Sequence, residues 1–158
     1  MEKLETQSVQ IRPVEAEDLS SISAVEETCF RDPFPSYFIK QLAEANPDTF
    51  LVAVDNGRVV GYAVVDNWTD HQHLVSIAVL ADSRRRGVGQ ALLDRLSRRL
   101  REGSLRLELR KSNGSALALY LKNGFSQTGV AHSYYTDGED AILMEKLIRK
   151  KLEVLAPV

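Results

Sequence analysis

Hydrophobic residues recur along this chain with two periods, and the switches between the periods mark the expected elements. A spacing of two residues indicates a strand with one buried face, and a spacing of three to four indicates an amphipathic helix. The pattern predicts helices over residues 15–29, 36–45, 88–102 and 113–123. It predicts strands over residues 9–12, 50–54, 58–65, 71–80, 105–110, 125–130 and 141–147. This mixture of helices and strands places the chain in the α/β class, in its α+β form.

Turn and cap residues define several boundaries between these elements. Asp55-Asn56-Gly57 separates two hydrophobic runs and predicts a tight hairpin, because Asn-Gly accepts the positive φ angles of a primed turn. We expect Ser36 and Asn113 to cap helices, and Gly103 to end the third helix. The prolines of Arg31-Asp32-Pro33-Phe34-Pro35 exclude a regular helix there.

Length and composition favour one globular domain. The chain has 158 residues, of which 44% are hydrophobic and 27% charged, which argues against a disordered chain or a disulfide scaffold. We expect a domain over residues 1–147 and a tail over residues 148–158. No window approaches eighteen consecutive apolar residues, and charges are scattered through the first thirty, so neither a membrane span nor a secretion signal is expected. The single cysteine, Cys29, fits a cytoplasmic protein.

Positive charge is concentrated in one stretch although the net charge is −2. Residues 84–111 hold ten of the twenty Lys and Arg residues and only three acids, so this stretch carries +7 and the remainder −9. A local basic stretch in an acidic protein fits a small anionic ligand better than nucleic acid. A solvated helix face is the simpler interpretation for the four arginines of the expected helix, Arg95, Arg98, Arg99 and Arg101.

The glycine-containing loop before that helix is a candidate phosphate site. Arg84-Arg85-Arg86-Gly87-Val88-Gly89 follows an expected strand and opens an expected helix, which brings backbone N–H groups and the positive end of the helix dipole together. The loop has neither the Gly-Lys-Ser/Thr of a P-loop nor a G-x-G-x-x-G fingerprint. His71 and His73 project from one expected strand as a possible metal pair, but no third ligand is evident, so no metal site is predicted.

Four motifs, in this order, resemble those of the GCN5-related N-acetyltransferases (GNAT). They are Ser76-Ile77-Ala78-Val79, Arg84-Arg85-Arg86-Gly87-Val88-Gly89, Glu108-Leu109-Arg110-Lys111-Ser112-Asn113 and Ala118-Leu119-Tyr120-Leu121-Lys122-Asn123-Gly124-Phe125. Tyr134-Tyr135 with Asp137-Gly138-Glu139-Asp140-Ala141 further resembles the RimI-type and archaeal protein N-terminal acetyltransferases. The similarity extends over about residues 8–147.

The resemblance implies a GNAT fold, which is a single mixed, mostly antiparallel sheet that splays in its middle and is flanked by about four helices. It implies an enzyme that transfers the acetyl group of acetyl-CoA to the N-terminal α-amine of proteins, like a ribosomal-protein alanine acetyltransferase, by direct general-base-assisted attack. The implied partners are acetyl-CoA and protein N-termini, with a ribosomal protein among the candidates. Neither nucleic acid nor a membrane is expected, and the oligomeric state is left open.

The resemblance also assigns residues to acetyl-CoA. The strand residues Ile77, Ala78 and Val79 would give backbone hydrogen bonds to the pantetheine arm and thioester, although a core strand is their simpler role. The pyrophosphate is assigned to the loop and first helical turn, namely Arg84, Arg85, Arg86, Gly87, Val88, Gly89 and Gln90. Asn113 would contact the cofactor besides capping its helix, and capping alone stays open for it.

Three residues carry the implied chemistry. Glu108 is the only acid on its expected strand and matches the general base of the family. Tyr120 lies two helical turns after Asn113 and matches the proton donor to the coenzyme A sulfur, so it also counts as a cofactor contact. His73 stands where some archaeal relatives have a second basic residue, whereas RimI itself departs there. An exposed ion pair for Glu108 and a buried aromatic role for Tyr120 remain open.

Two segments are assigned to the acceptor substrate. Tyr134 and Tyr135 resemble the family's contacts to the peptide backbone. The opposite wall would consist of Phe30, Asp32, Phe34 and Tyr37, where Asp32 would select the first residue or hold its α-ammonium. Packing in the core or in a turn is the alternative for each of these residues.

Three other functions remain open. The first is a GNAT enzyme that acts on a small amine or a lysine side chain. The second is a catalytically silent acyl-CoA sensor, against which the presence of both Glu108 and Tyr120 argues. The third is nucleic-acid binding through the basic helix, which the overall acidity disfavours.

Overall fold

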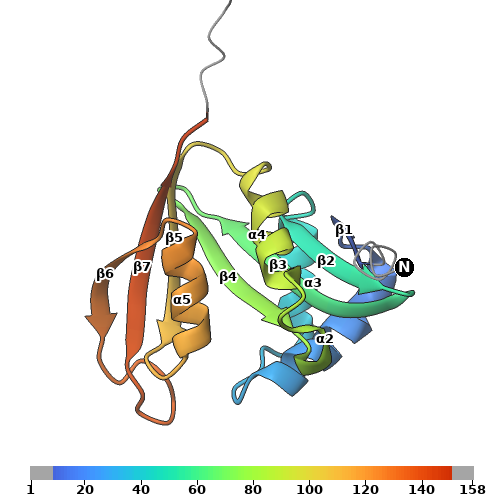
Figure 1. Cartoon of the computed structure of the whole chain (residues 1–158), viewed down its shortest axis with the longest axis horizontal. Coiled ribbons are helices and arrows are strands. Elements are labelled where there is room, and N and C mark those ends of the chain that lie inside the picture. The colour runs from blue at the N-terminus through green and yellow to red at the C-terminus, as the bar shows by residue number, and fades with distance from the viewer. Residues whose placement is uncertain (1–8, 151–158) are drawn as a thin grey trace, which may run out of the picture. The chain divides into compact units, whose positions relative to one another are not determined.

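The computed structural model describes residues 9–150, which belong to two compact units (Figure 1). Unit 1 ends at Arg99 and unit 2 begins at Leu100. Both units combine antiparallel strands with helices, which confirms the α/β class. Within the described residues, no helix is long and apolar enough to cross a membrane.

Unit 1 is built on four antiparallel strands in the order β1-β2-β3-β4, namely β1 (Val9–Pro13), β2 (Phe50–Asp55), β3 (Arg58–Asn67) and β4 (Gln72–Val79). The predicted hairpin joins β2 to β3, with φ angles of 50° at Asn56 and 78° at Gly57. These positive φ angles confirm the primed turn expected from the sequence. The β3–β4 register shifts between Val64 and Val65, close to the end of β4 that carries His73.

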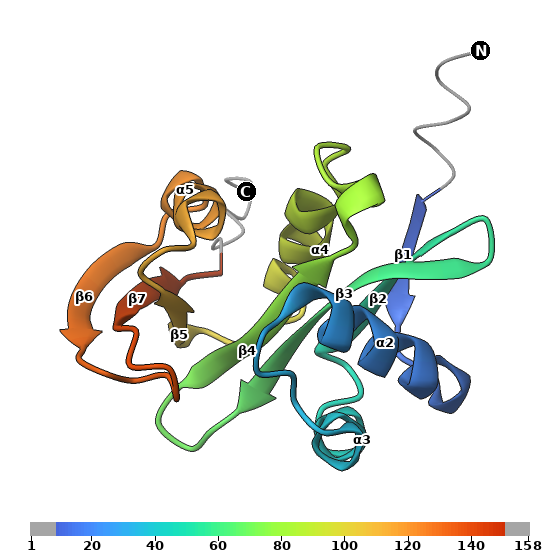
Figure 2. The same cartoon turned by 90° about the horizontal axis from the view of Figure 1, so that it is seen from below.

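Helices cover both faces of this unit. Figure 2 shows α2 (Leu19–Cys29) and α3 (Ser36–Ala45) on one face of the strands and α4 (Val88–Ser97) on the other. The buried hydrophobic residues beneath α2 and α3 are Ile22, Val25, Ile39, Leu42, Phe50, Val52, Tyr62, Val64 and Ala78. Val88, Leu92, Leu93 and Leu96 form the buried stripe of α4, which confirms the predicted helical spacing.

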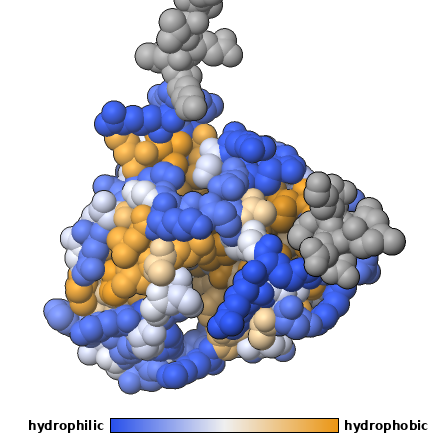
Figure 3. Space-filling view, viewed as in Figure 1, coloured by the Kyte–Doolittle hydropathy of each residue, from blue (hydrophilic) through white to orange (hydrophobic). Residues whose placement is uncertain are grey.

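Unit 2 contains three antiparallel strands in the order β5-β7-β6 and one helix. Its elements are β5 (Gly103–Arg110), α5 (Gly114–Lys122), β6 (Ser126–Ala131) and β7 (Ala141–Ile148). The alternation predicted for β5 is confirmed, because Leu105, Leu107 and Leu109 are buried while the intervening residues are more exposed. In the space-filling view, apolar surface is visible around α5 and β6, where Leu121 and Val130 are exposed (Figure 3).

Three local predictions were wrong. A 3₁₀ turn (Ala16–Asp18) precedes α2, so the helix is not continuous from Glu15. Pro35, not Ser36, occupies the N-cap of α3, because its extended backbone already leads into the first turn. Helix α4 ends at Ser97, and Gly103 instead begins β5 with a φ of 128°, a conformation that favours glycine.

The remaining fold predictions divide into confirmed and open ones. Mostly antiparallel strands and four flanking helices are confirmed within the described residues. The splay expected in the middle of the sheet and the boundary of a domain at residue 147 stay predictions. Of the expected tail, residues 151–158 lie outside the described residues, and Ile148 is the last residue of β7.

Candidate active site

The candidate phosphate loop ends in a left-handed residue that starts a helix. Gly87, with a φ of 78°, is the N-cap of α4, and Arg85 also has a positive φ of 66°. The backbone N–H groups of the first helical turn have no partners inside a helix, so they are available to an anion at this end. A Cβ added to Gly87 would meet nothing within 4 Å, which leaves the backbone open to a close approach.

Two of the three loop arginines are engaged with neighbouring segments of unit 1. Arg84 donates from Nε to the Val79 carbonyl at 2.8 Å, and its Nη2 lies 3.7 Å from Cys29 Sγ. Arg86 pairs with Asp55 of the β2–β3 hairpin at 2.9 Å. These contacts brace the loop against β4 and the hairpin, while Arg85 is exposed.

The strand leading into this loop is packed closely against β3. Gly61 faces Val79 across the ladder, and a Cβ added to Gly61 would lie 2.8 Å from the Ala78 carbonyl oxygen. Ala78 is buried, whereas Ile77 and Val79 are half-buried on the alternate positions. The close approach of β3 and β4 therefore leaves no room for a side chain at Gly61.

In unit 2, Glu108 and the tyrosine pair are neighbours. Glu108 projects half-buried from β5, and the Tyr134 hydroxyl donates to its Oε1 at 3.4 Å. The rings of Tyr134 and Tyr135 are edge-to-face with centroids 5.0 Å apart. Burial, with the adjacent Glu108 carboxylate, raises the pKa of Tyr134 and brings that of Tyr135 to about 12. Both phenols therefore keep their protons at neutral pH and present donors beside Glu108.

Arg110 joins β5 to the segment over residues 134–139, called the tyrosine segment. No role was assigned to Arg110 from the sequence. Its guanidinium lies 2.8 Å from both Asp137 and Glu139 and sits over the Tyr135 ring, 4.1 Å from the centroid. Glu139 also accepts from the Ser112 N–H at 2.7 Å, and these bonds hold its pKa below the usual value. The sequence held one indication of this pairing, namely the alternation of Glu108 and Arg110 on one strand and the acidic turn that follows later in the chain.

Tyr120 and Asn113 belong to α5. Asn113 caps the helix, as predicted, by accepting from the Ala116 N–H at 3.2 Å. Tyr120 is buried and packs edge-to-face on Phe125 at 5.4 Å. Burial, with a smaller contribution from Tyr135, raises the pKa of Tyr120 well above its ordinary value, so its hydroxyl keeps its proton.

The proposed substrate wall connects α2 to α3. Phe30 and Phe34 are half-buried and pack against the core, while Asp32 and Tyr37 are exposed. Packing in the core is therefore part of the role of the two phenylalanines. The Phe34 ring also stacks at a tilt on Phe38, with centroids 5.0 Å apart.

Glu26 of α2 holds this wall through a hydrogen bond to the backbone of Phe34. It is 1% exposed, and its carboxylate accepts from the Tyr62 hydroxyl and, at 2.9 Å, from the Phe34 N–H. Ser76 lies at 3.5 Å from Glu26 and 3.1 Å from the Tyr62 oxygen. Burial raises the pKa of Glu26, against the opposing effect of these hydrogen bonds. One indication of this role is visible in the sequence. Glu26 lies on the same helix face as Ile22, and an acid on that face has to be buried.

His73 lies on β4, whereas His71 precedes the first residue of that strand, so they are not two alternate positions of one strand as predicted. The two rings nevertheless meet, with His71 Nε2 3.2 Å from His73 Nδ1. Among residues 9–150, no group of three His, Cys, Asp or Glu side chains has a geometry suited to a metal ion.

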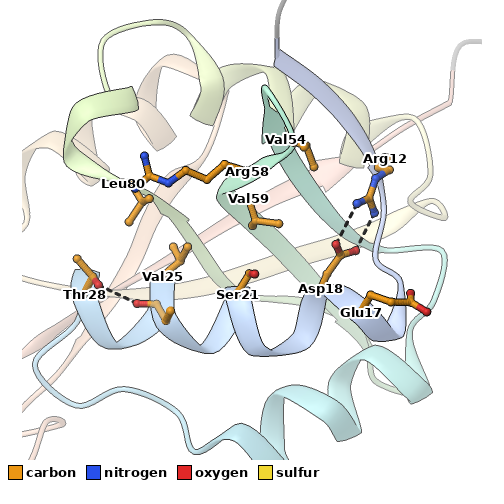
Figure 4. A pocket seen from close by; sticks show the side chains of 12 residues that line it. Arg12, Glu17, Asp18, Ser21, Val25, Thr28, Val54, Arg58, Val59 and Leu80 are labelled. Atoms are coloured by element: carbon orange, nitrogen blue, oxygen red, sulfur yellow. Dashed lines mark hydrogen bonds and ion pairs between the residues drawn. The ribbon is translucent and has the colours of Figure 1, made fainter.

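An open groove of about 500 Å³ lies elsewhere in unit 1, between α2 and the β2–β3 hairpin (Figure 4). Arg12 crosses one end of it and pairs with Asp18 through two bonds of 2.7 and 2.9 Å. This pairing lowers the pKa of Asp18. None of the residues predicted to contact acetyl-CoA or the acceptor lines this groove.

The sequence of residues 19–125 matches the Acetyltransferase (GNAT) family, which covers well over half of the chain. The chain belongs to the GNAT acetyltransferase family. It is thus an N-acetyltransferase, and GNAT acetyltransferases use acetyl-CoA as the acetyl donor. The four GNAT motifs recognised in the sequence lie between Ser76 and Phe125, and all of them fall within the matched residues.

Individual relatives place this GNAT chain near enzymes of protein acetylation. An N-alpha-acetyltransferase of Sulfurisphaera tokodaii is 34% identical over 151 residues, covering 85% of this chain and 90% of its own. The [ribosomal protein bS18]-alanine N-acetyltransferase of Escherichia coli K12 is 36% identical over 145 residues, covering 80% and 96%. The crystal structure of Ard1 from Thermoplasma volcanium superposes with a TM-score of 0.85 at 29% identity, covering 90% of this chain and 99% of that one.

Proposed function

We propose that this GNAT enzyme transfers the acetyl group of acetyl-CoA to the N-terminal α-amine of a protein or peptide. One observation carries the proposal. Glu108, the only carboxylate on β5, lies within hydrogen-bond reach of Tyr134, one of the two residues whose motif resembles a peptide-binding segment. The names of the Sulfurisphaera and Escherichia relatives support the same acceptor class. The second name makes a ribosomal-protein N-terminus one candidate substrate.

The acidity of the acceptor also favours an α-amine. With pKa values near 7.7 for an α-amine and 10.4 for lysine, forming the neutral amine at pH 7 costs about 1 kcal/mol against about 4.6 kcal/mol. A single carboxylate such as Glu108 is a modest base, and it suffices for the first of these. We assign Glu108 the removal of the ammonium proton, directly or through water.

The donor site is assigned to the loop and strand of unit 1. Acetyl-CoA, when bound, would supply the acetyl group, and coenzyme A would leave as the thiol. The open backbone at Gly87, the N–H groups of the first turn of α4 and the exposed Arg85 fit a pyrophosphate. Arg84 and Arg86 act mainly as braces of this loop, because their guanidinium groups are paired with Val79 and Asp55.

Tyr120 acts as a hydrogen-bond donor to a departing thiolate and retains its own proton. A thiol has a pKa near 8.5, whereas the pKa of Tyr120 is raised above its ordinary 10. Full transfer of the phenol proton would therefore cost at least about 2 kcal/mol. A hydrogen bond from the buried hydroxyl stabilises the developing negative charge without that cost.

The acceptor wall is assigned to the segment that Glu26 anchors. The exposed side chains of Asp32 and Tyr37 would meet the first residues of the peptide, while Phe30 and Phe34 fix the backbone that carries them. The tyrosine segment held by Arg110 would bind the peptide backbone.

A substrate panel tests this function. Release of free thiol from acetyl-CoA is measured with peptides that differ at the first residue, with the same peptides blocked at the N-terminus, and with small amines. Turnover of free peptides alone, and its loss in Glu108→Gln, would support the proposal. Turnover only with small amines would replace it by a metabolite acetyltransferase, and binding of acetyl-CoA without turnover of any amine would indicate a sensor.

A further inference from the structure

The tyrosine segment of unit 2 is closed at its two ends by Ser133 and Asp140. Asp140 Oδ1 accepts from the Ser133 N–H at 2.9 Å, and Asp140 Oδ2 lies 3.3 Å from His132 Nδ1. The Asp140 carbonyl accepts from the Lys111 N–H at 3.1 Å, which fixes Asp140 to the chain just beyond β5. Asp140 therefore ties the chain that leaves β6 to the neighbouring end of β5.

Ser133 has a backbone conformation that its residue type disfavours. Its φ is 52°, in the left-handed region that favours glycine, because an L side chain there crowds the following carbonyl. Such a residue persists where its surroundings hold it, and here the Asp140 carboxylate holds its N–H. The Ser133 N–H, with a smaller contribution from His132, lowers the pKa of Asp140, so the carboxylate is an ionised acceptor at neutral pH.

This left-handed residue allows two adjacent tyrosines to contact the same face of β5. Glu108 and Arg110 are alternate residues of β5, so their side chains share one face of the strand. Successive residues of an extended chain point to opposite faces. Tyr134 nevertheless donates to Glu108, and the next ring, that of Tyr135, lies against the Arg110 guanidinium. The left-handed turn at Ser133 interrupts the alternation just before this pair of rings.

We propose that Asp140 is a positioning residue, which holds Ser133 in its left-handed conformation and so directs the Tyr134 hydroxyl to Glu108. The hydroxyl in turn orients the carboxylate to which removal of the ammonium proton is assigned. Asp140 thus acts on Glu108 through Tyr134. The catalytic consequence rests on the proposed function, because it requires Glu108 to be the base, whereas the bond between Asp140 and Ser133 does not depend on it.

Three variants of the full chain separate the hydrogen bond to Ser133 from the charge of Asp140. Asp140→Ala removes the acceptor of the Ser133 N–H. Asp140→Asn keeps an amide oxygen at this place and is the conservative rescue. His132→Ala is the matched control, because it removes the other side-chain contact of Asp140, an exposed pair that contributes little, and leaves the Ser133 N–H bonded.

Amide hydrogen exchange followed by NMR measures this hydrogen bond without any substrate. We expect the Ser133 N–H to exchange about tenfold faster in Asp140→Ala than in the wild type, because its acceptor is gone. Exchange in Asp140→Asn and His132→Ala should stay close to that of the wild type. The N–H groups of β5 should exchange alike in every variant, since the effect is local and not a general loss of stability.

Steady-state kinetics measure the consequence for catalysis. Asp140→Ala should lower kcat for a peptide about tenfold, a coupling of the size found within one hydrogen-bond network, while KM for acetyl-CoA stays unchanged. The same replacement in a Tyr134→Phe background should have little further effect on kcat, because the hydroxyl through which Asp140 acts is already absent. Asp140→Asn and His132→Ala should keep kcat within about twofold of the wild type.

Each contrary result overturns a definite part. Unchanged exchange of the Ser133 N–H in Asp140→Ala would overturn the positioning of Ser133. Faster exchange with unchanged kcat, or an equal drop of kcat in the Tyr134→Phe background, would overturn the route through Tyr134. A drop of kcat in Asp140→Asn or His132→Ala as large as that in Asp140→Ala would assign the effect to charge. If the wild type acetylates no peptide, the proposed function and the catalytic role of Asp140 fail together, while the exchange result still decides the positioning of Ser133.

Discussion

Removal of the Glu26 carboxylate should loosen the wall between α2 and α3 and lower the stability of unit 1. This side chain lies 1% exposed at the meeting point of α2, β3 and β4. It accepts from the Tyr62 hydroxyl and the Phe34 N–H, with Ser76 nearby. Glu26→Ala takes away the acceptor from all of them at once.

The expected loss in the free energy of unfolding follows from these contacts. A buried donor left without a partner costs about 1–3 kcal/mol. Tyr62 retains Ser76 at 3.1 Å as an alternative partner, so its cost lies at the lower end, whereas the Phe34 N–H has lost its acceptor. Relief of a desolvated carboxylate offsets part of the loss. We expect about 2–4 kcal/mol for Glu26→Ala and about 1–2 kcal/mol for Glu26→Gln, which keeps the shape and one acceptor.

The titration of Glu26 should make the free energy of unfolding depend on pH, with a sign that follows from its pKa. Burial raises the pKa of Glu26 in the folded state above its ordinary value of 4.5. Between 4.5 and the raised value, the folded state therefore binds more protons than the unfolded state, and this group's contribution makes the protein less stable as the pH rises through that window. Glu26→Gln cannot titrate and should lose this part of the pH dependence.

Urea unfolding of the wild type and both variants at pH 5 and pH 8 measures these effects. Glu27→Gln is the matched control, because Glu27 is the exposed neighbour on the same helix. We also expect KM for the peptide to rise in Glu26→Ala, with KM for acetyl-CoA unchanged. An unfolding free energy of Glu26→Ala within about 0.5 kcal/mol of the wild type would refute the reasoning, because loss of the shared acceptor of Tyr62, Ser76 and the Phe34 N–H should not be neutral.

Three further predictions concern the remaining parts of the site. Tyr120→Phe should lower kcat by about 10²-fold with little change in KM for either substrate in steady-state kinetics, because only the hydroxyl is lost; an unchanged kcat would remove Tyr120 from the chemistry. Arg110→Ala should raise KM for the peptide more than it lowers kcat, since Tyr135 and the Asp137–Glu139 turn lose their anchor; an effect confined to KM for acetyl-CoA would contradict this. Gly87→Ala should destabilise the chain by about 1 kcal/mol in thermal unfolding and weaken acetyl-CoA binding in calorimetry, because φ is 78° there; unaltered binding would exclude the loop as the pyrophosphate site.

Much of the fold could be predicted because local rules agreed with the final environment. The Asn56-Gly57 turn depends on backbone sterics alone, and the alternating leucines of β5 depend on burial of one face. The end of α4 could not be predicted in the same way. Leu100 continues the hydrophobic spacing and is buried, yet it lies beyond Ser97, where the helix ends.

The site was predictable where a motif carried it, and less so where long-range contacts define it. Glu108 and Tyr134 are 26 residues apart in sequence and meet only through the pairing of β5, β6 and β7. Local patterns single out Glu26 and Arg110 as unusual positions, but their anchoring roles depend on partners in distant segments, which a local pattern does not identify.

The most direct test of the central claim is a competition between two amines in one molecule. A peptide that carries a free N-terminal α-amine and an internal lysine is incubated with the enzyme and acetyl-CoA, and tandem mass spectrometry locates the acetyl group. The account predicts acetylation at the α-amine, with strong reduction in Glu108→Gln. Acetylation of the lysine in preference to the α-amine, or equal rates in the variant and the wild type, would contradict it.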